Sequence, residues 1–171
     1  GKLVVNEELI GVMAAAGFKK LIFPVESGSQ DVIDEFASGK LNLAIHDIEG
    51  LIRCAKSHGI EIGGNYLFGW PGESEHNMQQ TYDLALQHMN AGMDYVNFHL
   101  IAPFPGSKLY DYATANEIML PELDPSDINW DTPSMQLPVS EEQLKDMITE
   151  KWESVNTKER IERLRGMMPT T

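Results

Sequence analysis

Apolar residues in the first part of the chain fall into two patterns, short continuous runs and stripes with helical spacing. The runs at 21–25, 60–68 and 95–101 predict strands, and their nearly continuous apolar character is typical of a sheet covered on both faces. No fourth strand is evident before residue 20. Because helical segments separate the runs, the pattern predicts right-handed crossovers and a parallel sheet. The fold class is therefore α/β, with about three parallel strands and flanking helices.

Stripes of apolar residues at helical spacing predict the helices between these strands. The first two are expected at 6–16 and 30–37, and Asn6 can cap the start of the first. The third helix ends before Gly59, a residue that suits a helix terminus, and a fourth spans about 75–90. The apolar stripe of the third helix consists of Ile45, Ile48, Leu51, Ile52 and Ala55.

The character of the chain changes after the third strand. A helix is expected at 108–116, and residues 120–138, which hold four prolines among acidic residues, are expected to be irregular. Ser140 and Gln143 stand at capping-box spacing and open a last helix, which runs into a charged tail that ends loosely at 167–171. A complete (β/α)8 barrel needs roughly 250 residues. Three strands therefore make a partial TIM-like (β/α) barrel of less than half that size, or a small open sheet.

Composition and charge narrow the classes of function. The chain has 26 acidic and 13 basic residues, and its net charge of −13 argues against a surface that binds nucleic acid. No apolar run approaches the roughly 18 residues of a membrane span. The single cysteine, Cys54, excludes an internal disulfide and a metal site built from three cysteines. We expect it to be buried and inert, and a chain without disulfides fits the cytoplasm.

Polar residues stand near the carboxyl ends of the predicted strands, where parallel α/β folds bind their ligands. Glu26 ends the first strand, and its carboxylate could accept hydrogen bonds from ribose hydroxyls or a substrate amine. It could equally cap the following helix or pair with a lysine. Asn97 and His99 share one face of their strand, as do Glu61 and Asn65. A histidine at such a position is otherwise a satisfied core residue.

Several other kinds of site are disfavoured. The five histidines lack the paired helical spacing of a zinc site. The glycines within 59–64 lie inside a predicted strand rather than in a phosphate-binding turn, which weakens a dinucleotide-binding interpretation. Gly28 and Ser29 have no paired histidine or oxyanion loop, which disfavours a serine hydrolase. A small enzyme that uses the polar residues at the strand ends for acid–base catalysis remains an alternative.

Three segments taken together resemble the radical S-adenosylmethionine (radical SAM) superfamily. Residues 17–29 are similar to the stretch into and beyond the fourth strand of its barrel. Residues 59–74 are similar to the fifth strand and its turn, and residues 103–110 to the segment after the sixth. Each motif is short, but their order and spacing are specific. The resemblance covers about residues 6–118 and is greatest to the branch that often carries an N-terminal cobalamin-binding domain.

The resemblance implies a (β/α)6 barrel, of which residues 1–118 would be the C-terminal half and residues 119–171 an extension. Members of the superfamily hold a 4Fe–4S cluster on a Cys-x3-Cys-x2-Cys loop after the first strand, and this cluster cleaves S-adenosylmethionine (SAM) to a 5′-deoxyadenosyl radical. With one cysteine, this chain is not expected to hold a cluster. Cobalamin is possible in the full-length protein. The chain would be a fragment of such an enzyme, inactive alone.

The resemblance also implies where SAM would lie. Residues after the fourth strand would meet the ribose or the methionine part, those of the fifth would pack near the adenine, and those of the sixth would follow the adenine edge, mainly through backbone groups. Lys40 could reach the methionine carboxylate, whereas Gly72 and Glu73 would shape a turn. The expected cofactor-binding residues are Glu26, Ser27, Ser29, Leu67, Phe68, His99, Leu100 and Ile101.

An alternative function is a non-catalytic nucleotide-binding or assembly module derived from the same fold. A half-barrel leaves a strand edge and an apolar face uncovered, which predicts self-association as a dimer that closes or continues the sheet. The other expected partners are SAM and a small-molecule substrate, which the sequence does not name.

Overall fold

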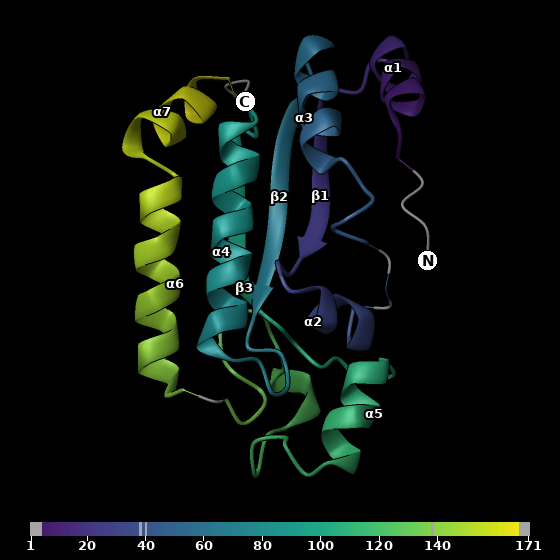
Figure 1. Ribbon diagram of the computed structural model, residues 1–171. Coiled ribbons are helices and arrows are strands. Elements are labelled where there is room, and N and C mark those ends of the chain that lie inside the picture. The colour runs from purple at the N-terminus through teal and green to yellow at the C-terminus, as the bar shows by residue number, and fades with distance from the viewer. Residues whose placement is uncertain (1–4, 38, 40, 138, 168–171) are drawn as a thin grey trace.

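The computed structural model describes residues 5–37, 39, 41–137 and 139–167 and confirms the α/β class (Figure 1). Its sheet has three strands in the order β1-β2-β3, and both pairings are parallel. The strands are β1 (Lys20–Glu26), β2 (Glu61–Phe68) and β3 (Tyr95–Leu100). Helical connections join each strand to the next, as parallel pairing requires.

The helices that the sequence predicts begin and end close to the expected positions. Asn6 caps the first helix by accepting a hydrogen bond from the N–H of Leu9 at 2.8 Å. Gly59 follows the third helix with a φ of 71°, a left-handed conformation that glycine adopts without strain. The helices are α1 (Glu7–Ala15), α2 (Gln30–Glu35), α3 (Ile48–Ser57), α4 (Glu75–Asn90), α5 (Lys108–Ala115), α6 (Glu141–Val155) and α7 (Lys158–Met167), with a 3-10 turn, η1 (Pro125–Asp127).

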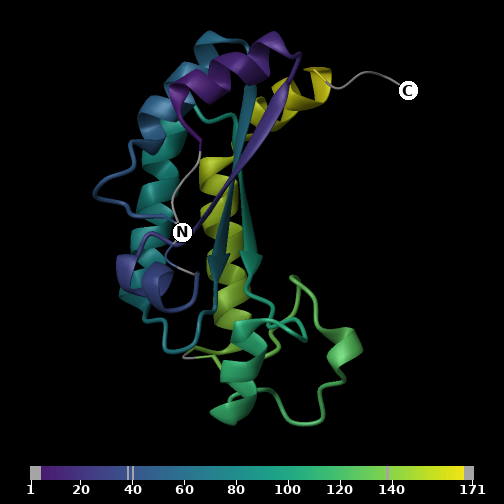
Figure 2. The ribbon, with the colours of Figure 1, turned by 90° about the vertical axis from the view of Figure 1, so that its right-hand side faces the viewer.

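The sheet has one covered face and one open face. Val25, Tyr66 and Phe98 are buried on the covered face, where α3 and α4 lie against β2 (Figure 2). Alternate residues on the open face, such as Asn97 and His99, are only partly buried. The prediction that both faces are covered is therefore wrong for the described residues. The apolar run of β3 is interrupted at every second position by a polar or amphipathic side chain, which marks a face left to solvent or ligand.

Three local predictions need correction. Ile45 lies in a turn before α3 and is 75% exposed, so it is not part of the buried stripe. Cys54 is half-buried between α1 and α3, with its Sγ 3.9 Å from the backbone oxygen of Glu7. Burial and the Glu7 carboxylate raise the pKa of this thiol, which disfavours the reactive thiolate. The charged tail forms a further helix, α7, which the sequence patterns did not predict. Of the end expected to be loose, 167–171, only Met167 lies in the described part, and it ends this helix.

The irregular segment of residues 119–137, which we call the crossing segment, lies beyond the carboxyl ends of the strands (Figures 1 and 2). A single antiparallel bridge joins Met119 to Met135. Backbone bonds on both sides of this bridge, such as that from the Gln136 N–H to the Ile118 oxygen at 2.7 Å, close the segment into a loop. Ile128, only 6% exposed, anchors its middle in the protein.

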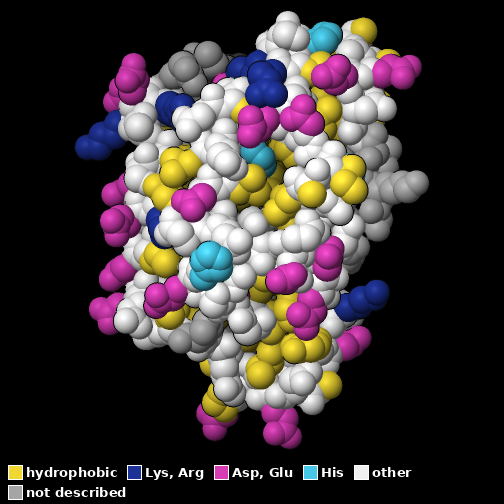
Figure 3. Space-filling model, in the orientation of Figure 1, with side chains coloured by type: hydrophobic (Ala, Val, Ile, Leu, Met, Phe, Trp, Pro, Cys, Tyr) yellow, Lys and Arg dark blue, Asp and Glu magenta, His cyan; other side chains and the backbone are white. Residues whose placement is uncertain are grey.

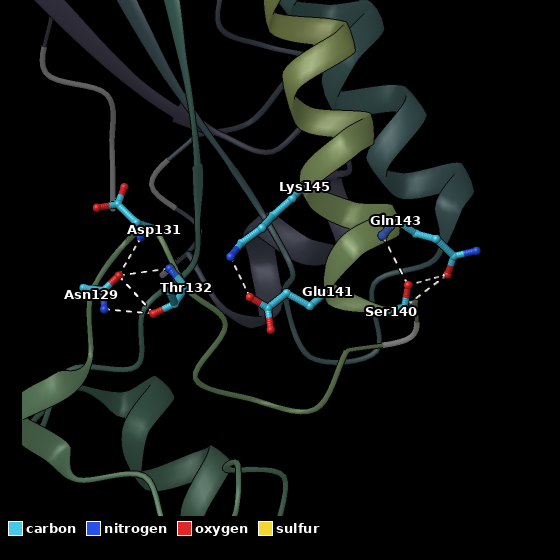
Figure 4. Close-up of polar contacts among 7 residues, drawn as sticks. All are labelled: Asn129, Asp131, Thr132, Ser140, Glu141, Gln143 and Lys145. Carbon is cyan, nitrogen blue, oxygen red and sulfur yellow. Dashed lines mark hydrogen bonds and ion pairs between the residues drawn. The ribbon is translucent and has the colours of Figure 1, made fainter.

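The last long helix closes the outer edge of β3. Ser140 and Gln143 form the predicted capping box at the start of α6 (Figure 4). At the other end, the Asn156 side chain accepts a hydrogen bond from the Val96 N–H at 3.1 Å and donates one to the Val96 oxygen at 3.0 Å. The Trp152 indole donates to the same oxygen at 3.1 Å. An amide side chain thus occupies the place of a neighbouring strand, which protects the sheet edge.

Candidate functional site

The three strand ends and the crossing segment enclose a small cavity on the open face of the sheet. Its volume is about 200 Å³, and it combines an acid, an amide, an imidazole and an indole with two apolar side chains. The lining residues are Pro24, Glu26, Asn65, Leu67, His99 and Trp130. The cavity lies at the carboxyl ends of parallel strands, the usual ligand position in such folds. We call it the strand-end cavity.

Glu26 enters this cavity from a strained backbone. Its φ is 73°, a left-handed conformation that few residues other than glycine adopt. The pairing of β1 with β2 also shifts register between Pro24 and Glu26, so the strand ends in a bulge. Such strain costs about 1–3 kcal/mol and is often found at ligand sites. The conformation turns the Glu26 side chain toward the strand-end cavity, which makes it the strongest candidate among the predicted residues.

Ser27 and Ser29 form the base of the turn after Glu26. The Ser27 hydroxyl is fully buried and lies 3.3 Å from the Thr81 hydroxyl. Ser29, 3% exposed, accepts a hydrogen bond from the Asn77 amide at 3.0 Å. Neither residue lines the strand-end cavity. Both bonds lead to α4, so these serines position Glu26 by tying its turn to that helix.

Gly28 allows this close approach between the turn and α4. A Cβ atom at this position would lie 2.2 Å from the Gln80 backbone oxygen and 2.6 Å from the Thr81 backbone nitrogen. Real Cβ atoms do not approach backbone so closely. The Gly28 N–H instead donates to the Thr81 hydroxyl at 2.9 Å. A glycine is therefore required if the Glu26 turn is to rest on α4.

Asn65, Asn97 and His99 meet across β2 and β3, as their shared strand faces predict. Asn65 pairs in register with Asn97, and the Asn97 amide donates to the Asn65 side-chain oxygen at 2.9 Å. Leu67 stands opposite His99 in the next pair. The His99 ring lies 6.3 Å from that of Trp130. The remaining donors and acceptors of the two amides could read the polar edge of a ligand.

Three predicted residues turn their side chains or backbone groups to other partners. The Phe68 ring is fully buried on the covered face, 5.3 Å from the Phe98 ring. Leu100 is buried too, and its N–H donates to the Trp130 oxygen at 3.2 Å. The Ile101 N–H donates to the Phe68 oxygen at 2.8 Å. Phe68 and Leu100 are therefore buried on the covered face of the sheet, opposite the strand-end cavity, and support the strands that line it. Lys40 lies outside the described residues.

The amino-terminal half of the open face carries a separate polar group. Lys20 forms a salt bridge with Glu61 at 3.1 Å, and its ammonium lies 4.6 Å from the centre of the Tyr95 ring. The Tyr95 side chain, followed by the Glu61 carboxylate, raises the pKa of Lys20, although burial opposes the rise. Glu61 and Asn65 do share a face, as predicted, but Glu61 is paired far from the strand-end cavity.

Glu73 shapes the turn after β2, as its position predicts. The carboxylate is 1% exposed, and its Oε2 accepts hydrogen bonds from the N–H groups of Gly69 at 2.7 Å and Trp70 at 3.2 Å. Burial raises the pKa of Glu73 to about 7, and the two backbone bonds partly oppose that rise. The residue holds the turn that ends β2 and does not line the strand-end cavity.

Trp130 lines the cavity from a segment in which the sequence patterns singled out no candidate. It belongs to the crossing segment, is 56% exposed and packs edge-on against Phe104 with ring centres 5.5 Å apart. The sequence did not predict its role, because Trp130 stands in a proline-rich, irregular stretch that no periodicity links to β3. An aromatic residue in a polar segment without a helical or strand pattern was the available signal.

The donor set of the chain does not fit an iron–sulfur cluster. Such a cluster needs three thiolates, and Cys54 is the only cysteine in the sequence. Among the described residues, no group of three or more His, Cys, Asp or Glu side chains is arranged to hold a metal ion. No helix in the described part of the chain is both long and apolar enough to cross a membrane.

The curated proteins that resemble this chain in sequence are named as methyltransferases. No family model matches the chain. It is 36% identical over 110 residues to cytidylyl-2-hydroxyethylphosphonate methyltransferase of Streptomyces wedmorensis, covering 61% of this chain and 20% of that protein. It is 26% identical over 115 residues to an uncharacterised methyltransferase of Pyrococcus horikoshii, covering 67% and 24%. Identity to bacteriochlorophyllide d C-12(1)-methyltransferase of Chlorobaculum tepidum is 26% over 104 residues, covering 61% and 22%.

A solved structure shares the fold. Coproporphyrinogen III oxidase (HemN) from Escherichia coli, a radical SAM enzyme, superposes with a TM-score of 0.58 and 16% identity, covering 92% of this chain and 31% of that one. The predicted partial barrel of parallel strands is thereby confirmed. At a coarse level, the chain is related in fold to a radical SAM enzyme and in sequence to methyltransferases. It spans about a fifth to a quarter of the curated relatives it matches.

Proposed function

We propose that this chain is the SAM-binding, C-terminal half of a radical SAM methyltransferase barrel, with residues 1–118 as the half-barrel and 119–171 as an extension. The observation that carries the proposal is the strand-end cavity, where a strained Glu26 meets Asn65 and His99 at the carboxyl ends of three parallel strands. The similarity to HemN supports the fold, and the names of the sequence relatives support methyl transfer.

In the proposed complex, the Glu26 carboxylate accepts hydrogen bonds from the ribose hydroxyls of SAM. Charged acceptors make such bonds worth about 1.5–3 kcal/mol each. Leu67 offers an apolar surface to the adenine, and His99 with the backbone carbonyl groups of Leu100 and Ile101 follows the adenine edge, because the N–H groups of these two residues already donate to protein oxygens. Phe68 contributes indirectly, because its ring fixes β2 against Phe98. Ser27 and Ser29 hold the Glu26 turn on α4.

The cluster chemistry of the proposed enzyme requires thiolates that this chain lacks. When bound, a 4Fe–4S cluster supplies the electron that cleaves SAM. Because the chain has one cysteine, it should bind SAM weakly and not cleave it. We propose no cobalamin-binding role for any of the residues named above.

The single cysteine also favours a second candidate, a non-catalytic nucleotide-binding or assembly module. Both candidates bind a nucleoside in the strand-end cavity. The two candidates predict different results when the chain is mixed with a cysteine-rich partner that supplies the missing thiolates, together with iron, sulfide and a reductant. Formation of 5′-deoxyadenosine from SAM under these conditions supports the enzyme, whereas binding without turnover supports the module.

Replacement of Glu26 tests the site. Glu26→Gln keeps the size of the side chain and removes the charge, so the dissociation constant for SAM, measured by isothermal titration calorimetry, should rise about tenfold. Glu122→Gln is the matched control, because Glu122 is also a glutamate with positive φ, 63°, but lies exposed in the crossing segment. Equal affinities for the wild type and the Glu26→Gln variant would contradict the assignment.

A further inference from the structure

We propose that Trp130 is a stacking platform in the strand-end cavity for a planar, nitrogen-bearing ring of nucleobase size. This inference deepens the proposed function, on whose cavity it rests. It assigns a specificity-determining residue from the crossing segment and names the chemistry of the group that the residue recognises.

The exposure of Trp130 is the first observation. A large aromatic side chain that is 56% exposed leaves more than half of its surface accessible to a ligand. The other two tryptophans are used differently, since Trp70 is 3% exposed and Trp152 donates its indole N–H to Val96. Trp130 instead lines the strand-end cavity. Stacking of a base on an aromatic side chain is worth about 1–3 kcal/mol.

The rigidity of the Trp130 backbone is the second observation. The side-chain oxygen of Asn129 accepts hydrogen bonds from the N–H groups of Asp131 at 2.7 Å and Thr132 at 2.9 Å (Figure 4). Asn129 also donates to the Thr132 hydroxyl at 2.9 Å. On the other side, the Trp130 oxygen is held by the Leu100 N–H at the end of β3. The indole is therefore presented to the cavity from a fixed turn, which lowers the entropic cost of binding.

The surroundings of Trp130 select the kind of ring. The Phe104 ring packs against the indole at an interplanar angle of 86° and helps to hold it in place. The centre of the His99 ring, which also lines the cavity, lies 6.3 Å from that of Trp130. Glu26 and Asn65 supply a carboxylate and an amide along the wall. A nucleobase offers both a flat face to the indole and polar edges to this carboxylate and amide, whereas an apolar ring offers only the flat face.

The ring could come from the adenine of SAM or from a nucleobase on the substrate. Titration of the chain with adenosine, cytidine and ribose, followed by tryptophan fluorescence and by calorimetry, separates the two. One nucleoside should quench emission saturably, and ribose should not. Preference for adenosine assigns the ring to SAM, and preference for cytidine assigns it to the substrate. Absence of saturable binding by either nucleoside overturns the proposal.

Two variants make the test specific. Trp130→Ala should weaken nucleoside binding about tenfold by calorimetry, and Trp130→Phe should retain most of the affinity. Phe18→Ala is the matched control, because Phe18 is also half-exposed, at 50%, but lies before β1 at the opposite end of the sheet. Unchanged affinity in Trp130→Ala overturns the inference. If Glu26→Gln still weakens SAM binding in that case, the proposed function stands without it.

Discussion

At the scale of single residues, the site depends on side chains held in unfavourable states. Glu26 occupies a left-handed conformation, and Glu73 keeps a carboxylate at 1% exposure in the turn after β2. Neither state would persist without its surroundings: α4 fixes the Glu26 turn through Thr81, and two backbone N–H groups hold Glu73. The strained residue Glu26 lies in the strand-end cavity, which fits the tendency of backbone strain to occur at ligand sites.

Glu73 should make stability depend on pH. Its pKa in the folded protein, about 7, lies above the ordinary value of 4.5, so between these pH values the folded state binds more protons than the unfolded state. This contribution to stability is present below pH 4.5 and is lost as pH rises to about 7, amounting to about 3 kcal/mol. Urea unfolding of the Glu73→Gln variant at several pH values should no longer show this loss of stability between pH 4.5 and about 7.

The exposed Glu75 gives the control for this prediction. It stands two residues further on, in the first turn of α4. Glu75→Gln should keep the pH dependence of the wild type. If Glu73→Gln and the wild type lose stability in parallel between pH 4.5 and 7, Glu73 does not titrate as described.

At the scale of elements, α6 and the crossing segment complete the edge of β3. Asn156 bonds both backbone groups of Val96, and the Trp130 oxygen bonds the Leu100 N–H. These contacts join residues about 30 to 60 positions apart, so the outer edge of β3 is protected by parts of the chain that follow it.

Removal of the Asn156 side chain should therefore destabilise the fold. In Asn156→Ala, the Val96 N–H is buried without its partner, which should cost about 2 kcal/mol in urea unfolding. Asn116→Ala is the control, because the exposed Asn116 side chain makes a single bond to the Tyr112 oxygen. A loss as small as in this control would mean that α6 does not close the edge.

The sequence predicted the elements better than their contacts. The helix at 75–90 and the capping box of α6 were readable because caps and apolar stripes are local signals. Ile45 continued a stripe by spacing alone, yet the turn before α3 exposes it. The predicted residues Glu26, Leu67 and His99 do line one cavity. Trp130 was not predicted, since its place depends on a contact with Leu100 that no local pattern records.

At the scale of the whole molecule, the open face of the sheet and a net charge of −13 act in opposite directions on self-association. Ile22 is 47% exposed on the open face of β1, at the edge of the sheet. Acidic side chains are distributed over the surface in the view of Figure 3, and copies of the chain should repel one another at low ionic strength.

We therefore expect a dimer in sedimentation experiments, favoured by added salt. Ile22→Glu should shift it to monomer, because a charge on this face opposes pairing. Ile45→Glu, at an isoleucine that is 75% exposed in the turn before α3, should leave the dimer intact. A monomer at all concentrations and salt levels would contradict the predicted self-association.

The most direct test of the proposed function is a map of where SAM contacts the chain. Titration of the isotopically labelled protein with SAM, followed by NMR, should shift the backbone signals of Glu26, Leu67 and His99 first, because these residues line the strand-end cavity. The signals of the groove between α4 and α6, lined by Tyr82 and Met147, should stay unchanged. Saturable shifts confined to that groove, or no shifts at all, would contradict a SAM site at the strand ends.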